Sequence, residues 1–149
     1  MMRSLSLKKA LTAWLAVSVV YDLLSILAYR LCHNAYNIGI GKLLYRPFLI
    51  DLNARGVFLL GAYQLIIAGT FVAGYIFWRS SISRKEWREG VAGGIIFGFF
   101  IWLVGVSVTL LHVYLAVNME FPVIIYWMTI NLINYPLMGA ITGAIYRDA

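Results

Sequence analysis

The stretch VAGGIIFGFFIWLVGVSVTLLHVYL, residues 91–115, runs for 25 residues without a formally charged side chain. A helix needs about 20 mostly apolar residues to cross the hydrocarbon core of a bilayer, so this stretch predicts a transmembrane helix. Three further windows, residues 10–29, 57–78 and 121–146, meet the same criterion. We therefore expect an all-α integral membrane protein, a single membrane domain over residues 1–149 built as a bundle of four transmembrane helices.

The composition agrees with a lipid bilayer as the solvent. The chain is 62% hydrophobic and 12% charged, whereas soluble domains are about half apolar and a quarter charged. The net charge of +6 is also found in nucleic-acid-binding proteins, but the basic residues lie between the apolar windows. That placement favours contact with lipid headgroups and no nucleic acid. The segments between the windows are short and carry no catalytic motif, so we do not expect an enzyme.

The lysine and arginine counts predict the direction of the chain across the membrane. The N-terminal tail, the segment 79–90 and the C-terminus together carry eight, whereas the loop 30–56 and the turn before residue 121 carry four. Because cytoplasmic segments are richer in these residues, we expect a cell-membrane protein with both termini in the cytoplasm. Within the loop 30–56, the apolar spacing over residues 40–48 indicates either a short interfacial helix or an apolar loop packed over the bundle.

The two halves of the chain show a weak internal repeat. The segment Trp14–Val19 is similar to Trp102–Val108, with one residue inserted, and Gly74–Arg79 is similar to Gly143–Arg147. Two helical hairpins in a parallel repeat would explain both similarities. The alternative is that aromatic residues followed by arginine arise in any span that ends in the cytoplasm.

Glycines spaced along the third and fourth windows indicate close helix packing. Small residues on one helix face let two helix backbones approach closely. Such packing matters in lipid, because lipid tails are as apolar as the helix surfaces and the hydrophobic effect does not hold the helices together. We expect this packing within the bundle or between protomers, as a homo-oligomer or part of a larger membrane complex. A sliding surface is the alternative. The glycines are Gly90, Gly94, Gly98, Gly105, Gly139 and Gly143.

Polar residues inside the apolar windows carry the strongest functional signal, because each is costly in lipid and usually faces the interior. Counting about 1.5 Å per residue from each window's centre places one group from every helix about 4–6 Å outward of the midplane. A fifth group lies near the midplane on the fourth helix. The five residues are Asp22, Gln64, Ser107, Asn131 and Asn134.

Asp22 is the only acidic residue in the four windows. Amides and hydroxyls can hold helices together by bonding to one another, but a carboxyl group in lipid must be protonated, paired or hydrated. Pro136 should kink the fourth helix and free the carbonyl of Leu132 as a further ligand. These residues predict either a path linked to protons or cations, centred on Asp22, or polar contacts that merely join the helices.

Histidine, cysteine and carboxylate side chains at the outer edge form a candidate set of ligands for a transition metal or a haem. They are Cys32, His33, His112 and Glu120. No CxxCH or HExxH motif is present, and the alternative is a pair of separate interfacial histidines. The sequence names no cofactor.

Three functions therefore stay open. The first is a small transporter or permeation protein centred on Asp22, and we expect this one. The others are an accessory subunit of a larger membrane complex and a membrane redox protein that uses His33 and His112. The size, the four spans and the single acid in the first span are similar to those of small multidrug transporters, although the first loop is longer and no residue is carried over from that family.

Overall fold

The computed structural model describes residues 7–37, 54–82, 90–117 and 121–147. This part of the chain is helical, in the order α1 (Leu7–Asn37), α3 (Ala54–Ser81), α5 (Gly90–Ile101), the five-residue π-helix η1 (Trp102–Val106), α6 (Ser107–Val117) and α7 (Phe121–Ile145). The predicted all-α fold is confirmed. The expected interfacial helix in the first loop and the candidate ligand Glu120 lie outside the described residues.

Four helical stretches are long and apolar enough to cross a membrane: Leu7–Ala28, Gly61–Ser81, Gly90–His112 and Ile124–Ile145. At about 1.5 Å per residue each spans roughly the 30 Å of a bilayer's hydrocarbon core. Helix α1 continues beyond its apolar stretch to Asn37. Residues 30–37, expected in the first loop, are therefore helical, and Cys32 and His33 lie on the last turns of α1.

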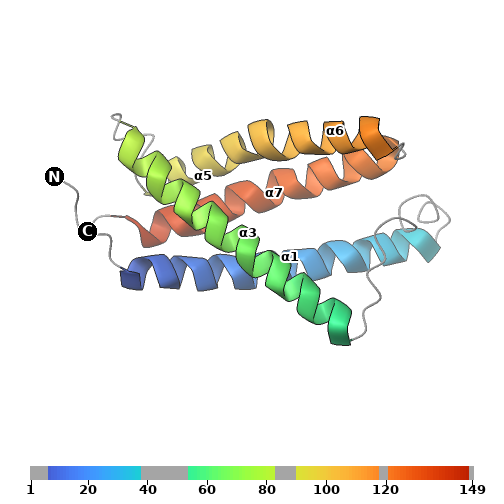
Figure 1. Cartoon of the computed structure of the whole chain (residues 1–149), viewed down its shortest axis with the longest axis horizontal. Coiled ribbons are helices and arrows are strands. Elements are labelled where there is room, and N and C mark those ends of the chain that lie inside the picture. Colours follow the sequence, from blue (N-terminus) through green and yellow to red (C-terminus); the bar gives the residue numbers. More distant parts are fainter. Residues whose placement is uncertain (1–6, 38–53, 83–89, 118–120, 148–149) are drawn as a thin grey trace.

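The helices form two antiparallel pairs. Helix α7 lies along α5, η1 and α6, while α1 runs beside α7 and α3 crosses them obliquely (Figure 1). Helix α1 begins and α7 ends at the same end of the bundle (Figure 1). We call this the terminal end and the opposite one the far end.

Helices α5 and α7 meet along what we call the glycine seam, formed by Gly90, Gly94, Gly98, Gly139 and Gly143. A Cβ atom on Gly94 would overlap the carbonyl group of Gly139, and a Cβ atom on Gly139 would overlap that of Gly94. A Cβ atom on Gly143 would overlap the carbonyl oxygen of Gly90, whose φ of +70° itself favours glycine. The two backbones are therefore in direct contact, which only glycine permits.

Gly105 lies outside this seam, in contrast to the expected stripe of four glycines. Gly105 is exposed, and the atom nearest to a Cβ atom built on it is Cγ2 of Ile101, at 3.9 Å. The expected stripe assumed an uninterrupted α-helix. Because η1 changes the helical period at Trp102, the spacing that aligns the earlier glycines does not extend to Gly105.

The apolar core lies toward the terminal end, where α3 rests on α5 through the ring of Phe97. That ring contacts Phe71, Tyr75 and Trp78 of α3, with centroid distances of 5.0, 5.5 and 5.7 Å. Gly74 makes room for it, because a Cβ atom there would come within 3.3 Å of Cζ of Phe97. The buried core residues are Ala13, Val17, Ala68, Phe71, Val72, Tyr75, Phe97, Met138 and Tyr146.

One tryptophan joins the two helices of each pair. The indole N–H of Trp14 donates to the carbonyl of Leu65 in α3 at 2.8 Å, and that of Trp102 donates to the carbonyl of Met128 in α7 at 2.9 Å. A serine then bonds back to each tryptophan carbonyl. Ser18 does so from four residues on, at 2.8 Å, and Ser107 from five residues on, at 3.0 Å. The segment Trp102–Val108 has one residue more than Trp14–Val19, and the π-helix η1 accommodates this extra residue.

Candidate functional site

Asp22 lies on α1 inside the first span and is half-buried. Its Oδ1 atom is buried and has no hydrogen-bond partner among the described residues. Leaving a buried carboxyl oxygen without a partner costs free energy, and a charged one costs more. The site therefore has to be completed by a proton, a cation, water or another group.

Gln64 of α3 and Asn134 of α7 are the buried amides of the predicted polar set, each with an exposed fraction of 4%. Their burial turns both side chains away from lipid and toward neighbouring helices, as expected for amides in a membrane. Each amide offers both a donor and an acceptor. Helices α3 and α7 can therefore supply neutral hydrogen-bonding groups to the interior of the bundle. Asp22 borders this interior from α1.

Asn131 and Ser107 bond to their own helices instead. Nδ2 of Asn131 donates to the carbonyl of Trp127 at 2.8 Å, and the hydroxyl of Ser107 donates to that of Trp102 at 3.0 Å. Such local bonds satisfy a polar side chain without tying one helix to another. We therefore separate these two residues from Asp22, Gln64 and Asn134.

The polar groups lie in the half of the spans nearer the far end, and their expected common level stays a prediction. Counting from the centres of the apolar stretches that contain them, Asn134 lies near the midplane, and Asn131, Asp22 and Ser107 lie about 5, 7 and 9 Å from it toward the far end. Helix α3 crosses the other helices obliquely (Figure 1), so the same count does not give the level of Gln64. The four counted groups form a graded series toward the far end.

Three tyrosines accompany this series, and sequence reasoning did not single them out. Tyr21, Tyr63 and Tyr135 lie on α1, α3 and α7, with their phenol groups within electrostatic range of one another. Each is the direct chain neighbour of Asp22, Gln64 or Asn134, in that order. That pairing of a tyrosine with a polar residue in three spans was the signal that could have identified them. Tyr21 and Tyr135 are partly buried, whereas Tyr63 is 60% exposed.

Pro136 lies inside α7, which runs as one helix from Phe121 to Ile145. Proline has no N–H to donate to the carbonyl of Leu132, one turn earlier. The Cα atom of Pro136 lies 2.8 Å from a Cβ atom built on Gly98, so this proline borders the glycine seam. The predicted kink stays a prediction.

The metal or haem hypothesis gains no geometric support in the described part of the chain. His112 is exposed on α6, and the described residues contain no group of three His, Cys, Asp or Glu side chains placed to hold a metal ion. Glu120 and the side chains of Cys32 and His33 lie outside the description. The hypothesis therefore stays a prediction.

The four candidate spans define a class, the multi-pass helical membrane proteins. No protein-family model matches the chain, and comparisons with curated proteins and with solved structures give no match either. A function for this chain therefore has to be argued from its own residues.

Proposed function

We propose that this chain is a small transporter or permeation protein in which Asp22 binds and releases a proton or a small cation. One observation carries the proposal: a carboxyl oxygen is buried inside a membrane span without a partner among the described residues. Carboxyl groups inside membrane helices are rare and commonly mark ion or proton paths.

The surroundings of Asp22 support this proposal. Gln64 and Asn134 are buried on the two helices that pack against α1, and amide oxygens are suitable ligands for a hard cation. The large core rings lie toward the terminal end, whereas the polar series lies toward the far end. We infer that, in the described arrangement, the apolar core closes the path between Asp22 and the terminal end.

The proposal is tested by ion flux into liposomes that contain the purified full-length chain. We expect the wild type to dissipate an imposed proton, sodium or potassium gradient faster than empty liposomes, and Asp22→Asn to slow this about tenfold or more, a loss equivalent to about 1.4 kcal/mol. Asp51→Asn is the matched control, since this acid lies outside the apolar windows, and it should retain the wild-type rate.

Unchanged flux in Asp22→Asn would contradict the proposed role of this residue. Purification from native membranes decides what would replace it. A homogeneous homo-oligomer without flux would leave permeation unsupported, whereas a stoichiometric partner protein would favour the accessory-subunit function.

We further propose that both termini face the cytoplasm. The start of α1 and the end of α7 lie at one end of the bundle (Figure 1). Lys8, Lys9, Arg79 and Arg147 gather near the helix ends there. An excess of basic residues is typical of the cytoplasmic side, which supports this orientation.

Finally, we propose that the two helical hairpins derive from one duplicated hairpin. In both, a tryptophan of the first helix bonds to a carbonyl of the second, and a serine bonds back to that tryptophan. The sequence shows only that Trp14–Val19 and Trp102–Val108 have similar residues. The shared hydrogen bonds add a structural similarity to this. A parallel repeat of this kind is a common way to build a transporter.

A further inference from the structure

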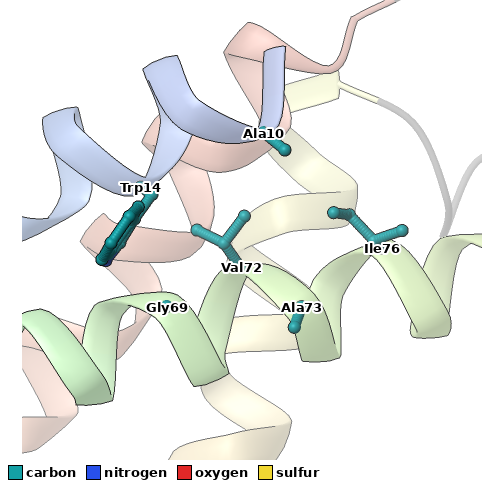
Figure 2. Close-up of a pocket in the computed structure, with 6 residues that line it drawn as sticks. All are labelled: Ala10, Trp14, Gly69, Val72, Ala73 and Ile76. Carbon is teal, nitrogen blue, oxygen red and sulfur yellow. The ribbon is translucent and has the colours of Figure 1, made fainter. Parts of the chain in front are cut away.

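An apolar groove runs between α1 and α3 near the terminal end (Figure 2). Its volume is about 240 Å³, and it is lined by Ala10, Trp14, Gly69, Val72, Ala73 and Ile76. Ala10 and Trp14 come from α1, and the others come from α3 (Figure 2). From Gly69 to Ile76 the groove extends about 10 Å along α3.

The groove exists because small residues leave space beside a fixed ring. The indole of Trp14 is held by its bond to the carbonyl of Leu65, and a Cβ atom on Gly69 would lie 3.3 Å from its Nε1 atom. Trp14 therefore closes the deep end. Ala10 and Ala73 fill little of the remaining volume, so the groove stays open toward the start of α1.

Basic residues flank the open end on both helices. Lys8 and Lys9 directly precede Ala10 in α1, and Arg79 follows Ile76 by three residues, which places it on the same face of α3. Arg79 lies about 4.5 Å further along the helix axis, toward the end of the span. Its guanidinium also lies 5.8 Å from the ring centre of Tyr146, which keeps the charge at this end of the bundle.

The size and the chemistry of the groove select its occupant. Its volume is below the roughly 300–1,000 Å³ of ordinary small-molecule sites, and its lining is almost entirely apolar. A polar substrate would find no hydrogen-bonding partner there. A narrow apolar groove that opens onto cations at the end of a span matches a lipid with part of one acyl chain inside the groove and an anionic headgroup outside it. Basic pockets between transmembrane helices bind such headgroups.

We infer that this groove is a binding site for one anionic phospholipid. An acyl chain lies along Val72, Ala73 and Ile76, and Lys8, Lys9 and Arg79 attract the phosphate group. The inference is independent of the proposed transport function, because it uses neither Asp22 nor the polar residues near it.

The test is native mass spectrometry of the purified full-length chain with added phosphatidylglycerol or phosphatidylcholine of identical acyl chains. We expect one phosphatidylglycerol to be retained about tenfold more than phosphatidylcholine. The double variant Lys8→Gln with Arg79→Gln should reduce phosphatidylglycerol binding by about fivefold per charge removed and leave phosphatidylcholine unchanged.

A groove-filling variant supplies the second measurement. Ala73→Leu should lower the retention of phosphatidylglycerol about tenfold, whereas Ala92→Leu, which enlarges an exposed alanine of α5, should leave it unchanged. If Ala73→Leu does not fold, Ala10→Leu replaces it. Equal retention of the two lipids, or binding that survives both groove-filling variants, would overturn the inference. A change of oligomer mass in Ala73→Leu would also overturn it, because a second copy would then occupy the groove.

Discussion

Helices α5 and α7 touch backbone to backbone, whereas α1 and α3 meet through side chains. In the first pair a glycine faces a glycine, as Gly94 does Gly139. In the second pair a glycine faces a large ring, as Gly69 does Trp14. The same loss of side-chain volume therefore gives direct contact in one pair and leaves a groove beside the other.

This difference assigns different tasks to the two pairs. Close approach of the two backbones gives many weak contacts, including Cα–H···O contacts, and leaves no free space between the helices. The α1–α3 pair has a groove and contains Asp22 and Gln64. We therefore infer that α5 and α7 form a fixed support, from which α7 also presents Asn134, and that the groove binds its ligand along α1 and α3.

The largest effect should come from adding a methyl group in the glycine seam. Gly94→Ala places Cβ into the carbonyl of Gly139, so the helices have to move apart, and we expect a loss of about 3 kcal/mol in the free energy of unfolding. Unfolding in mixed detergent micelles, followed by circular dichroism, measures this loss.

Gly105→Ala is the matched control, because a Cβ atom there has no neighbour closer than 3.9 Å. Its effect should stay within about 0.5 kcal/mol. Equal destabilisation by the two substitutions would show that the seam is not the main contact between α5 and α7.

A smaller effect should come from removing either interhelical tryptophan bond. Trp14→Phe and Trp102→Phe each keep most of the ring volume and remove one N–H donor. Hydrogen bonds between membrane helices contribute about 0.6 kcal/mol on average, so each variant should lose about 1 kcal/mol when the ring's repacking is included. The same micelle assay measures both losses.

The double variant sharpens this comparison. Because the two bonds lie in different helix pairs, the two losses should add within about 0.5 kcal/mol. A loss confined to one of the two variants would mean that the hairpins do not use their tryptophans alike, and the proposed duplication would lose its main support.

The smallest effect should come from deleting Gly105. The deletion places Ser107 four residues after Trp102, which is the spacing of Ser18 after Trp14, so η1 can revert to a regular α-helix. We expect a change in the free energy of unfolding within about 0.5 kcal/mol. Deletion of Ile95 is the control, since it turns every later residue of α5 by about 100° out of the seam and should abolish folding.

If deletion of Gly105 were as damaging as deletion of Ile95, the extra residue would be essential to the helix and not an insertion into it. A folded protein that loses ion flux would instead assign η1 to the transport mechanism.

The four spans could be predicted from the sequence because helix length and apolarity are local properties. The spacing of Gly94 and Gly98 predicted one face for close packing but left its partner open, and the structure places this face against α7. Gly105 could not be placed, because the change to a π-helix at Trp102 depends on how α5 and α6 together fit α7.

The site was predictable in its residue types and less so in its geometry. An acid in an apolar window draws attention at once, which is why the sequence singles out Asp22 as a candidate. The local bonds of Asn131 and Ser107 depend on rotamers, which the sequence does not specify. The groove was missed because it results from small residues on two helices about 60 positions apart, and nothing in either helix alone indicates their alignment.

Because α1 continues beyond its apolar stretch, the chemistry of Cys32 can report the direction in which the chain crosses the membrane. Its apolar stretch ends at Ala28, and the helix continues to Asn37, so position 32 lies about 6 Å beyond the span. Cys32 is the only cysteine in the chain, and no substitution is needed to follow its chemistry. If both termini are cytoplasmic, a maleimide that cannot cross membranes should label intact cells at this residue. Labelling only after the cells are opened would reverse the orientation.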